Sequence, residues 1–220
     1  MNYKGVIFDL DGTLLNTLDD LSDSANKVLK KHHLMQHTRD DFKRFIGSGA
    51  RKLVERMLPE EKREDTFIDQ LLSEFKTEYG MNCDNKTVPF PGIISLVNQL
   101  HEGGIKMTVL SNKPHDLTLK CCQRLLPEDL FEEIMGQKEG KPRKPDPATA
   151  LELAKRMELD PEQIIFLGDS ENDIHTAQSG GFFPVGVTWG MRTRKQLEEC
   201  GAKTIIGMPD ELLAFIFPSS

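Results

Sequence analysis

Short apolar runs alternate with segments of helical periodicity along most of the chain. Each run ends at glycine, proline or polar residues and is too brief for a buried helix, so it is predicted to be a buried strand. These predicted strands cover residues 6–8, 105–110, 164–167, 184–187 and 204–206. The helices predicted between them cover 93–101, 114–125 and 148–157. This alternation predicts an α/β fold, a Rossmann-like doubly wound parallel sheet with helices on both faces.

Residues 17–83 differ, because they carry helical periodicity and no strand pattern. Thr17 and Thr38 stand at positions where a side-chain hydroxyl commonly caps a helix. Gly47-Ser48-Gly49 interrupts the periodicity between two short helices. We therefore predict an all-helical domain, residues 17–83, inserted into a core formed by residues 1–16 and 84–220.

The composition limits the classes of function. The chain has 220 residues, 38% of them hydrophobic, which is enough for one domain with a smaller insertion. A formal charge of −7 without a basic run argues against a role at nucleic acid or a membrane surface. The four cysteines lack the spacing of a metal site, so reduced thiols are expected. No segment resembles a signal peptide or a membrane span, and we expect a cytoplasmic monomer or weak homodimer.

Acidic residues follow the first predicted strand. Asp9 and Asp11 are two positions apart, so an extended chain directs both carboxylates to the same side. Two carboxylates this close repel each other unless a cation lies between them or one stays protonated, and either state is useful in catalysis. Gly12 allows a tight turn near a ligand, and Thr13 offers a hydroxyl.

Three further segments bring polar groups to the edge where an open parallel sheet binds ligands, the carboxyl ends of its strands. Ser111-Asn112-Lys113 leads into a helix whose N-terminus can hold an anion. Lys144 lies on a chain stiffened by two prolines, and Asp169 and Asp173 form a second acidic pair. Each residue alone has a structural explanation, as a helix cap or a solvated lysine. Their occurrence together at successive strand ends indicates a catalytic site.

In order and spacing, these segments resemble the four motifs of the haloacid-dehalogenase superfamily of phosphotransferases. The matching residues are Asp9-Leu10-Asp11-Gly12-Thr13, Ser111-Asn112-Lys113, Lys144-Pro145 and Gly168-Asp169-Ser170-Glu171-Asn172-Asp173. The inserted helices look like the cap domain of that family. Within the family, Gly47-Ser48-Gly49-Ala50 and Gly186-Val187-Thr188-Trp189-Gly190 are similar to phosphoglycolate phosphatases, although relatives acting on pyrophosphate and other small phosphate esters share them.

The resemblance implies a Mg²⁺-dependent phosphatase that hydrolyses a small phosphate monoester, such as phosphoglycolate, through an aspartyl phosphate. Asp9 would be the nucleophile, Asp11 the acid and base, and Lys144 a catalytic cation. The metal ligands implied are Asp9, the main-chain carbonyl of Asp11, Asp169 and Asp173. Asp173 would bind the metal through a water molecule, or would instead pair with Lys144. The substrate contacts expected are Thr13, Ser111, Asn112, Lys144, Gly49 and Arg51.

Several alternatives remain open at this point. A pyrophosphatase or a phosphosugar mutase shares all four motifs and differs mainly in the cap. A phosphate-accepting receiver module, which signals rather than catalyses, lacks a helical insertion after its first strand. Two explanations for Arg51 are equally good: it lies on a solvated helix face, or it contacts a substrate carboxylate. Asn16 stands where many relatives carry an acid, which puts the usual link between the nucleophile loop and the cap in doubt.

Overall fold

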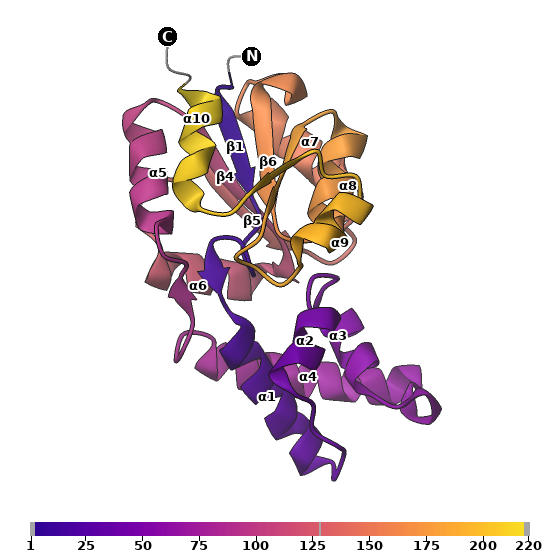
Figure 1. The fold of residues 1–220 in the computed structure, drawn as a ribbon. Helices are drawn as coiled ribbons and strands as arrows, with labels where there is room; N and C mark the ends of the chain where they lie inside the picture. Colours follow the sequence, from indigo (N-terminus) through magenta and orange to yellow (C-terminus); the bar gives the residue numbers. More distant parts are fainter. Residues whose placement is uncertain (1–2, 128, 218–220) are drawn as a thin grey trace.

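The computed structural model describes residues 3–127 and 129–217. A six-stranded sheet forms the centre of the larger part of the molecule, with all strands parallel and in the order β5-β4-β1-β6-β7-β8 (Figure 1). The strands are β1 (Gly5–Phe8), β4 (Lys106–Pro114), β5 (Glu133–Gln137), β6 (Ile164–Gly168), β7 (Phe183–Val187) and β8 (Thr204–Ile206). The predicted parallel sheet is confirmed.

Helices cover both faces of this sheet. Successive side chains of β1 point to opposite faces, so Val6 and Phe8 belong to one apolar cluster and Ile7 to another. The first cluster includes residues of α5 (Ile93–Glu102), α6 (His115–Leu125) and α10 (Leu213–Ile216). The second includes residues of α7 (Ala148–Arg156) and α8 (Glu171–Gly180), and α9 (Arg194–Glu199) packs beside α8. The doubly wound arrangement is therefore confirmed.

A group of helices lies beyond the carboxyl ends of the strands (Figure 1). It consists of α1 (Leu18–Lys31), α2 (Arg39–Phe45), α3 (Ala50–Met57) and α4 (Asp65–Asn82), with a 3₁₀ turn at Glu60–Lys62. The chain enters this group through β2 (Leu15–Asn16) and leaves through β3 (Val88–Pro89), and these two strands pair antiparallel. We call these helices the cap. The boundaries at residues 17 and 83 stay a prediction.

A buried carboxylate joins the base of the cap to the returning chain. Asp20, in the first turn of α1, accepts hydrogen bonds from the backbone N–H groups of Lys86 and Thr87, at 2.9 and 2.8 Å. The Thr87 hydroxyl donates a third, at 2.7 Å. These charge-assisted bonds hold the two crossings between core and cap together.

Three local details differ from the sequence-based predictions. The strand predicted over 105–110 continues to Pro114, because the second motif stays extended past an irregularity in its pairing with β5. That motif therefore lies within the strand rather than after it. Strand β5 itself was not predicted, since Glu133 and Gly136 interrupt its apolar pattern. Thr17 precedes α1 but does not cap it: its backbone is already helical (φ −98°, ψ −2°), whereas a capping residue needs an extended one.

Two expectations from composition can be compared with the structure. All four cysteines are free thiols, and three of them are buried. Within residues 3–127 and 129–217, no helix is both long enough and apolar enough to cross a bilayer.

Candidate active site

Three buried carboxylates converge at the carboxyl edge of the central strands. Asp9 follows β1, Asp169 follows β6, and Asp173 lies in the first turn of α8. One oxygen of each lies within 4.8 Å of the others. The sheet explains the convergence: β1 and β6 are neighbours with Phe8 beside Leu167, so the residues that follow must meet.

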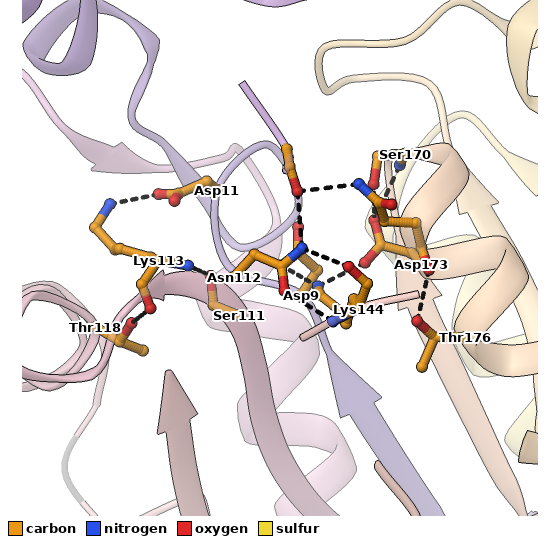
Figure 2. Close-up of polar contacts among 12 residues, drawn as sticks. Asp9, Asp11, Ser111, Asn112, Lys113, Thr118, Lys144, Ser170, Asp173 and Thr176 are labelled. Carbon is orange, nitrogen blue, oxygen red and sulfur yellow. Dashed lines mark hydrogen bonds and ion pairs between the residues drawn. The ribbon is translucent and has the colours of Figure 1, made fainter. Parts of the chain in front are cut away.

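Lys144 lies inside this cluster. Its Nζ is 2.6 Å from Oδ1 of Asp9 and 2.6 Å from Oδ1 of Asp173 (Figure 2). The other oxygen of Asp173 accepts hydrogen bonds from the backbone N–H and the hydroxyl of Ser170, at 3.0 and 2.6 Å. Asn112 fixes the backbone of Lys144, because its side chain accepts from the Lys144 N–H at 2.9 Å and donates to the Lys144 carbonyl at 3.0 Å. Asp173 thus pairs with Lys144, one of the two roles expected for it.

Burial and crowding change the acidity of these groups. Burial, followed by the nearby charge of Asp173, raises the pKa of Asp9 well above its usual range despite the contact with Lys144. The same two causes raise the pKa of Asp169 to about 7. Burial lowers the pKa of Lys144, but Asp173 and Asp9 more than offset this and the net shift is upward. The cluster therefore holds one firmly charged ammonium and more carboxylate than it can easily keep ionised without a further cation.

Close packing fixes the position of Asp169. Its Oδ2 accepts a hydrogen bond from the Met191 N–H at 2.6 Å. A Cβ at Gly12, whose φ is +94°, would collide with the Asp169 carboxylate, and a Cβ at Gly190 would collide with that carboxylate and with the Gly12 carbonyl. The glycines of the first motif and of the 186–190 segment therefore allow two loops to close around this acid.

The Asp11 side chain lies apart from those of Asp9 and Asp173, beside Lys113 (Figure 2). Lys113 Nζ donates to Oδ1 of Asp11 at 2.6 Å and to the Tyr79 hydroxyl at 2.7 Å. Burial lowers the pKa of Lys113, but the negative charge of Asp11 outweighs it and the pKa lies well above its ordinary value. Because Tyr79 belongs to α4, the hydrogen bond from this buried ion pair to Tyr79 connects the core to the cap.

The loop between α2 and α3 is held against the core. The Gly47 carbonyl accepts hydrogen bonds from the side-chain amides of Asn112 and Asn172, at 3.0 and 3.1 Å. Gly49 of the same loop lies so near that a Cβ there would be 3.3 Å from the Asn112 carbonyl. This contact keeps the cap docked over the site.

Arg192 adds a second contact, to the end of α2 and to the loop that follows it. Its guanidinium pairs with Glu171 at 2.9 Å and donates to the main-chain carbonyls of Lys43 and of Ile46, the latter at 3.2 Å. The Arg192 side chain is 9% exposed, so the contact is largely shielded from water. Sequence reasoning missed this residue, since an arginine that binds main-chain carbonyls leaves no pattern in its partners.

The docked cap and the strand ends line a shared cavity. Its core wall is polar and its cap wall is mostly apolar. The core wall includes Asp9, Asp11, Ser111, Asn112 and Lys113, and the cap wall includes Leu21, Ile46, Gly47, Gly49, Ala50, Leu53, Phe75 and Tyr79. A small molecule with one charged end and a short organic part fits this division.

The structure brings most of the predicted site residues to this cavity or to the acid cluster, but two lie elsewhere. Arg51 is turned toward the cap surface, where it pairs with Asp65 at 2.7 Å and Asp69 at 3.3 Å. The Thr13 hydroxyl is buried, with no hydrogen-bond partner among the described residues. Neither Arg51 nor Thr13 is among the residues that line the cavity.

Residues 6–187 match the family model of the haloacid dehalogenase-like hydrolases. The chain belongs to this family. The matched part of this haloacid dehalogenase-like hydrolase includes all four segments that carry Asp9, Ser111, Lys144 and Asp169. It also includes the cap, so both walls of the cavity lie within the family match. The protein is accordingly an enzyme of the phosphatase type found in this family.

Similar proteins agree with this family. The hydrolase is 35% identical over 194 residues to a phosphoglycolate phosphatase of Pasteurella multocida, with 86% of this chain and 87% of the relative covered. A crystal structure from Lactobacillus delbrueckii subsp. bulgaricus, also named as a phosphoglycolate phosphatase, is 32% identical with a TM-score of 0.93 and full coverage of both chains. A β-phosphoglucomutase of Clostridium difficile, 22% identical with a TM-score of 0.80 over 96% and 93% of the two chains, has the same fold.

Proposed function

We propose that the protein is a Mg²⁺-dependent phosphatase that hydrolyses a small phosphate monoester through an aspartyl phosphate on Asp9. The observation that carries the proposal is the buried convergence of Asp9, Asp169 and Asp173 around Lys144, next to a cavity between the core and the cap. Phosphoglycolate is the first substrate to test, since it is the one that the names of the similar phosphatases give.

The oxygen-only donor set of the cluster suits Mg²⁺. Asp9, Asp169 and the main-chain carbonyl of Asp11 would hold the ion directly. Asp173 would act from the second layer, because both of its oxygens already bind Lys144 and Ser170. When bound, the ion would offset the repulsion among the carboxylates and neutralise charge on the phosphoryl group.

Asp9 and Asp11 divide the chemistry between them. In the first step an Asp9 oxygen bonds to phosphorus, the bond from phosphorus to the ester oxygen breaks, and that oxygen takes a proton from Asp11. In the second step the oxygen of a water molecule attacks phosphorus while Asp11 takes a proton from it. The bond between phosphorus and Asp9 then breaks. The products are an alcohol and inorganic phosphate, and both aspartates return to their starting states.

Lys144 and Ser111 would hold the phosphoryl oxygens during both steps. The Lys144 ammonium is already placed against the nucleophile and stays charged, so it can offset the charge that develops in the transition state without rearranging. Asn112 supports it by fixing its backbone. The docked cap would exclude bulk water, which strengthens these electrostatic contacts.

Purified protein should be assayed for phosphate release with Mg²⁺ and with excess chelator. The panel should contain phosphoglycolate, pyrophosphate and several sugar phosphates. We expect release of inorganic phosphate from a small monoester, and its loss in chelator. Conversion of a sugar phosphate into an isomer without phosphate release would favour a mutase instead.

We also propose that the protein is a cytoplasmic monomer or weak homodimer. Size-exclusion chromatography tests the oligomeric state.

A further inference from the structure

Lys113 is the one cationic side chain among the described residues that line the cavity. Its side chain is 3% exposed, and its ammonium has two described hydrogen-bond partners, Asp11 and the Tyr79 hydroxyl. Apolar side chains of Leu53 and Phe75 form much of the opposite wall. A second charged group on a substrate would therefore find a counter-ion at Lys113 and at no other described residue of the wall.

The position of Lys113 relative to the chemistry is equally specific. Under the proposed function, Asp11 protonates the ester oxygen, so the atoms attached to that oxygen must lie near the Asp11 carboxyl. Lys113 Nζ is 2.6 Å from Oδ1 of Asp11. A substrate with an anionic group one or two atoms beyond its ester oxygen would bring that group to Lys113.

The ion pair in this structure also needs an exchange of partners. Asp11 is held on the Lys113 side, apart from the carboxylate cluster around Asp9 (Figure 2). To reach the ester oxygen, the Asp11 carboxyl must give up some of its contact with Lys113. A buried ammonium left without an anion is strongly unfavourable, so the exchange is easiest when the substrate supplies the replacement anion.

We propose that Lys113 is a specificity-determining residue, which selects small phosphate esters or anhydrides with a second anionic group beside the leaving oxygen and frees Asp11 when that group binds. The inference rests on the proposed function and deepens it. A carboxylate and a second phosphate share the required chemistry, and the assay below separates them. Tyr79 orients the ammonium from α4, so this recognition is complete only while the cap is docked.

The test compares three substrates in wild type and in Lys113→Met. These are phosphoglycolate, pyrophosphate and the neutral amide of phosphoglycolate. In wild type, kcat/KM should be higher for at least one anionic substrate than for the amide. In Lys113→Met, kcat/KM for that substrate should fall by roughly 10- to 100-fold more than for the amide, the range expected for a lost hydrogen bond to a charged group. Lys113→Arg keeps the charge and should retain part of the preference.

Two controls separate this role from a structural one. Lys120 of α6 donates to the Gly80 carbonyl, so it also reaches from core to α4, but it does not line the cavity. In Lys120→Met, the ratio of kcat/KM for phosphoglycolate to kcat/KM for its amide should stay at the wild-type value. If Lys113→Met is poorly folded, calorimetry on Asp9→Asn with Lys113→Arg still measures whether phosphoglycolate binds more tightly than its amide.

Two results would overturn the inference, and they differ from each other. If Lys113→Met loses the same factor in kcat/KM on the amide as on the substrates with a second anionic group, Lys113 acts on Asp11 alone. Equal use of phosphoglycolate, pyrophosphate and the neutral amide by wild type would remove the selectivity itself. Absence of phosphate release from every ester would instead refute the proposed function, on which the inference depends.

Discussion

The two walls of the cavity are built in different ways. On the core side, Asp9 lines the cavity and is bonded to Lys144, which lies behind it with Asp173; all three charged groups are buried, and neighbouring polar groups hold them in place. On the cap wall, apolar side chains face the cavity, and Tyr79 supplies the polar contact to Lys113. Under the proposed function, the core side would supply the reacting groups and the Lys113 ammonium, and the cap wall would supply apolar contacts and the Tyr79 hydroxyl.

The difference follows from how each wall is held. Groups on the core wall come from neighbouring strands of one parallel sheet, so the register of β1 with β6 sets their spacing. The cap wall depends on the paired strands β2 and β3 and on hydrogen bonds to loop carbonyls such as that of Gly47. Changes in the acid cluster should therefore affect the chemical step, and changes at the cap contacts should affect binding.

The largest effect is expected at Asp9. Asp9→Asn replaces the nucleophilic oxygen with an amide of the same shape, and kcat should fall by about 10⁶-fold, the scale seen when a nucleophile is removed. The fold should persist, since the change removes one charge from a crowded acidic cluster. Steady-state assays with circular dichroism check both statements. Activity within tenfold of wild type would contradict the assignment.

Lys144→Met should affect both turnover and stability. Removing the ammonium leaves Asp9 and Asp173 buried without their counter-ion, which costs about 3–5 kcal/mol in the free energy of unfolding. We also expect kcat to fall by about 10²- to 10³-fold, as when one group that stabilises charge in the transition state is lost. Urea titration and steady-state kinetics measure these two effects.

Lys141→Met is the matched control for Lys144→Met. Lys141 also precedes a proline, but its side chain is 59% exposed and lies 3.6 Å from Glu152. An exposed pair of this kind contributes about 1 kcal/mol or less, so stability and turnover should stay near wild type. Equal losses in the two variants would remove the distinction between the buried and the exposed lysine.

The stability of the core wall should depend on pH and on Mg²⁺ together. Without metal, the pKa of Asp169 in the folded protein is about 7, above its value in the unfolded chain. Between about pH 4 and 7 the folded state binds more protons than the unfolded state, so the free energy of unfolding decreases as pH rises through this window. Free Mg²⁺ at a concentration of about 100 times its Kd would add about 2.7 kcal/mol to the free energy of unfolding.

Mg²⁺ and the proton compete for the same carboxylate, so the increase in Tm on adding Mg²⁺ should be larger at about pH 8 than at about pH 5.5. Thermal unfolding at matched ionic strength measures this difference, with Ca²⁺-free buffers and an NaCl control for screening. The same Tm increase at both pH values would contradict binding at Asp169.

The smallest effect is expected where the core holds the cap loop. Arg192→Ala removes the hydrogen bonds to the carbonyls of Lys43 and Ile46, so the docked position is less populated and KM should rise by about tenfold. We expect kcat to change less, because Arg192 does not contact the acid cluster. Arg194→Ala is the control, since that exposed side chain donates to the Ile205 carbonyl on the core. A fall in kcat alone would contradict this role of Arg192.

Sequence periodicity was sufficient for most of the fold. The apolar runs before Asp9 and Asp169 are buried strands, and Thr38 caps its helix as its position in the sequence suggests. Strand β5 escaped prediction because its two apolar residues are flanked by Glu133 and Gly136, and its burial depends on neighbours distant in sequence. Local patterns therefore predict elements whose burial is regular, and miss those defined by tertiary packing.

The candidate site shows the same division. Asp9, Asp11 and Asp169 follow recognisable strand ends, and Lys144 lies in a motif with two prolines, so their convergence could be predicted from the order of the motifs. Tyr79 belongs to an apolar stripe of α4, and nothing in that pattern indicates that its hydroxyl meets Lys113. Arg51 has the right charge and position in sequence for a substrate contact, but the helix directs it to Asp65. Partners across domains depend on orientation, which periodicity alone does not specify.

The central claim is that a phosphoryl group is transferred to Asp9. Trapping the resulting aspartyl phosphate tests this claim most directly. Enzyme with Mg²⁺ and its best substrate should be quenched in acid during turnover and reduced with borohydride, which converts an acyl phosphate on aspartate into homoserine. Peptide mass spectrometry should then find homoserine at position 9 in wild type and none in Asp9→Asn. Homoserine at another aspartate, or none during active turnover, would contradict the account.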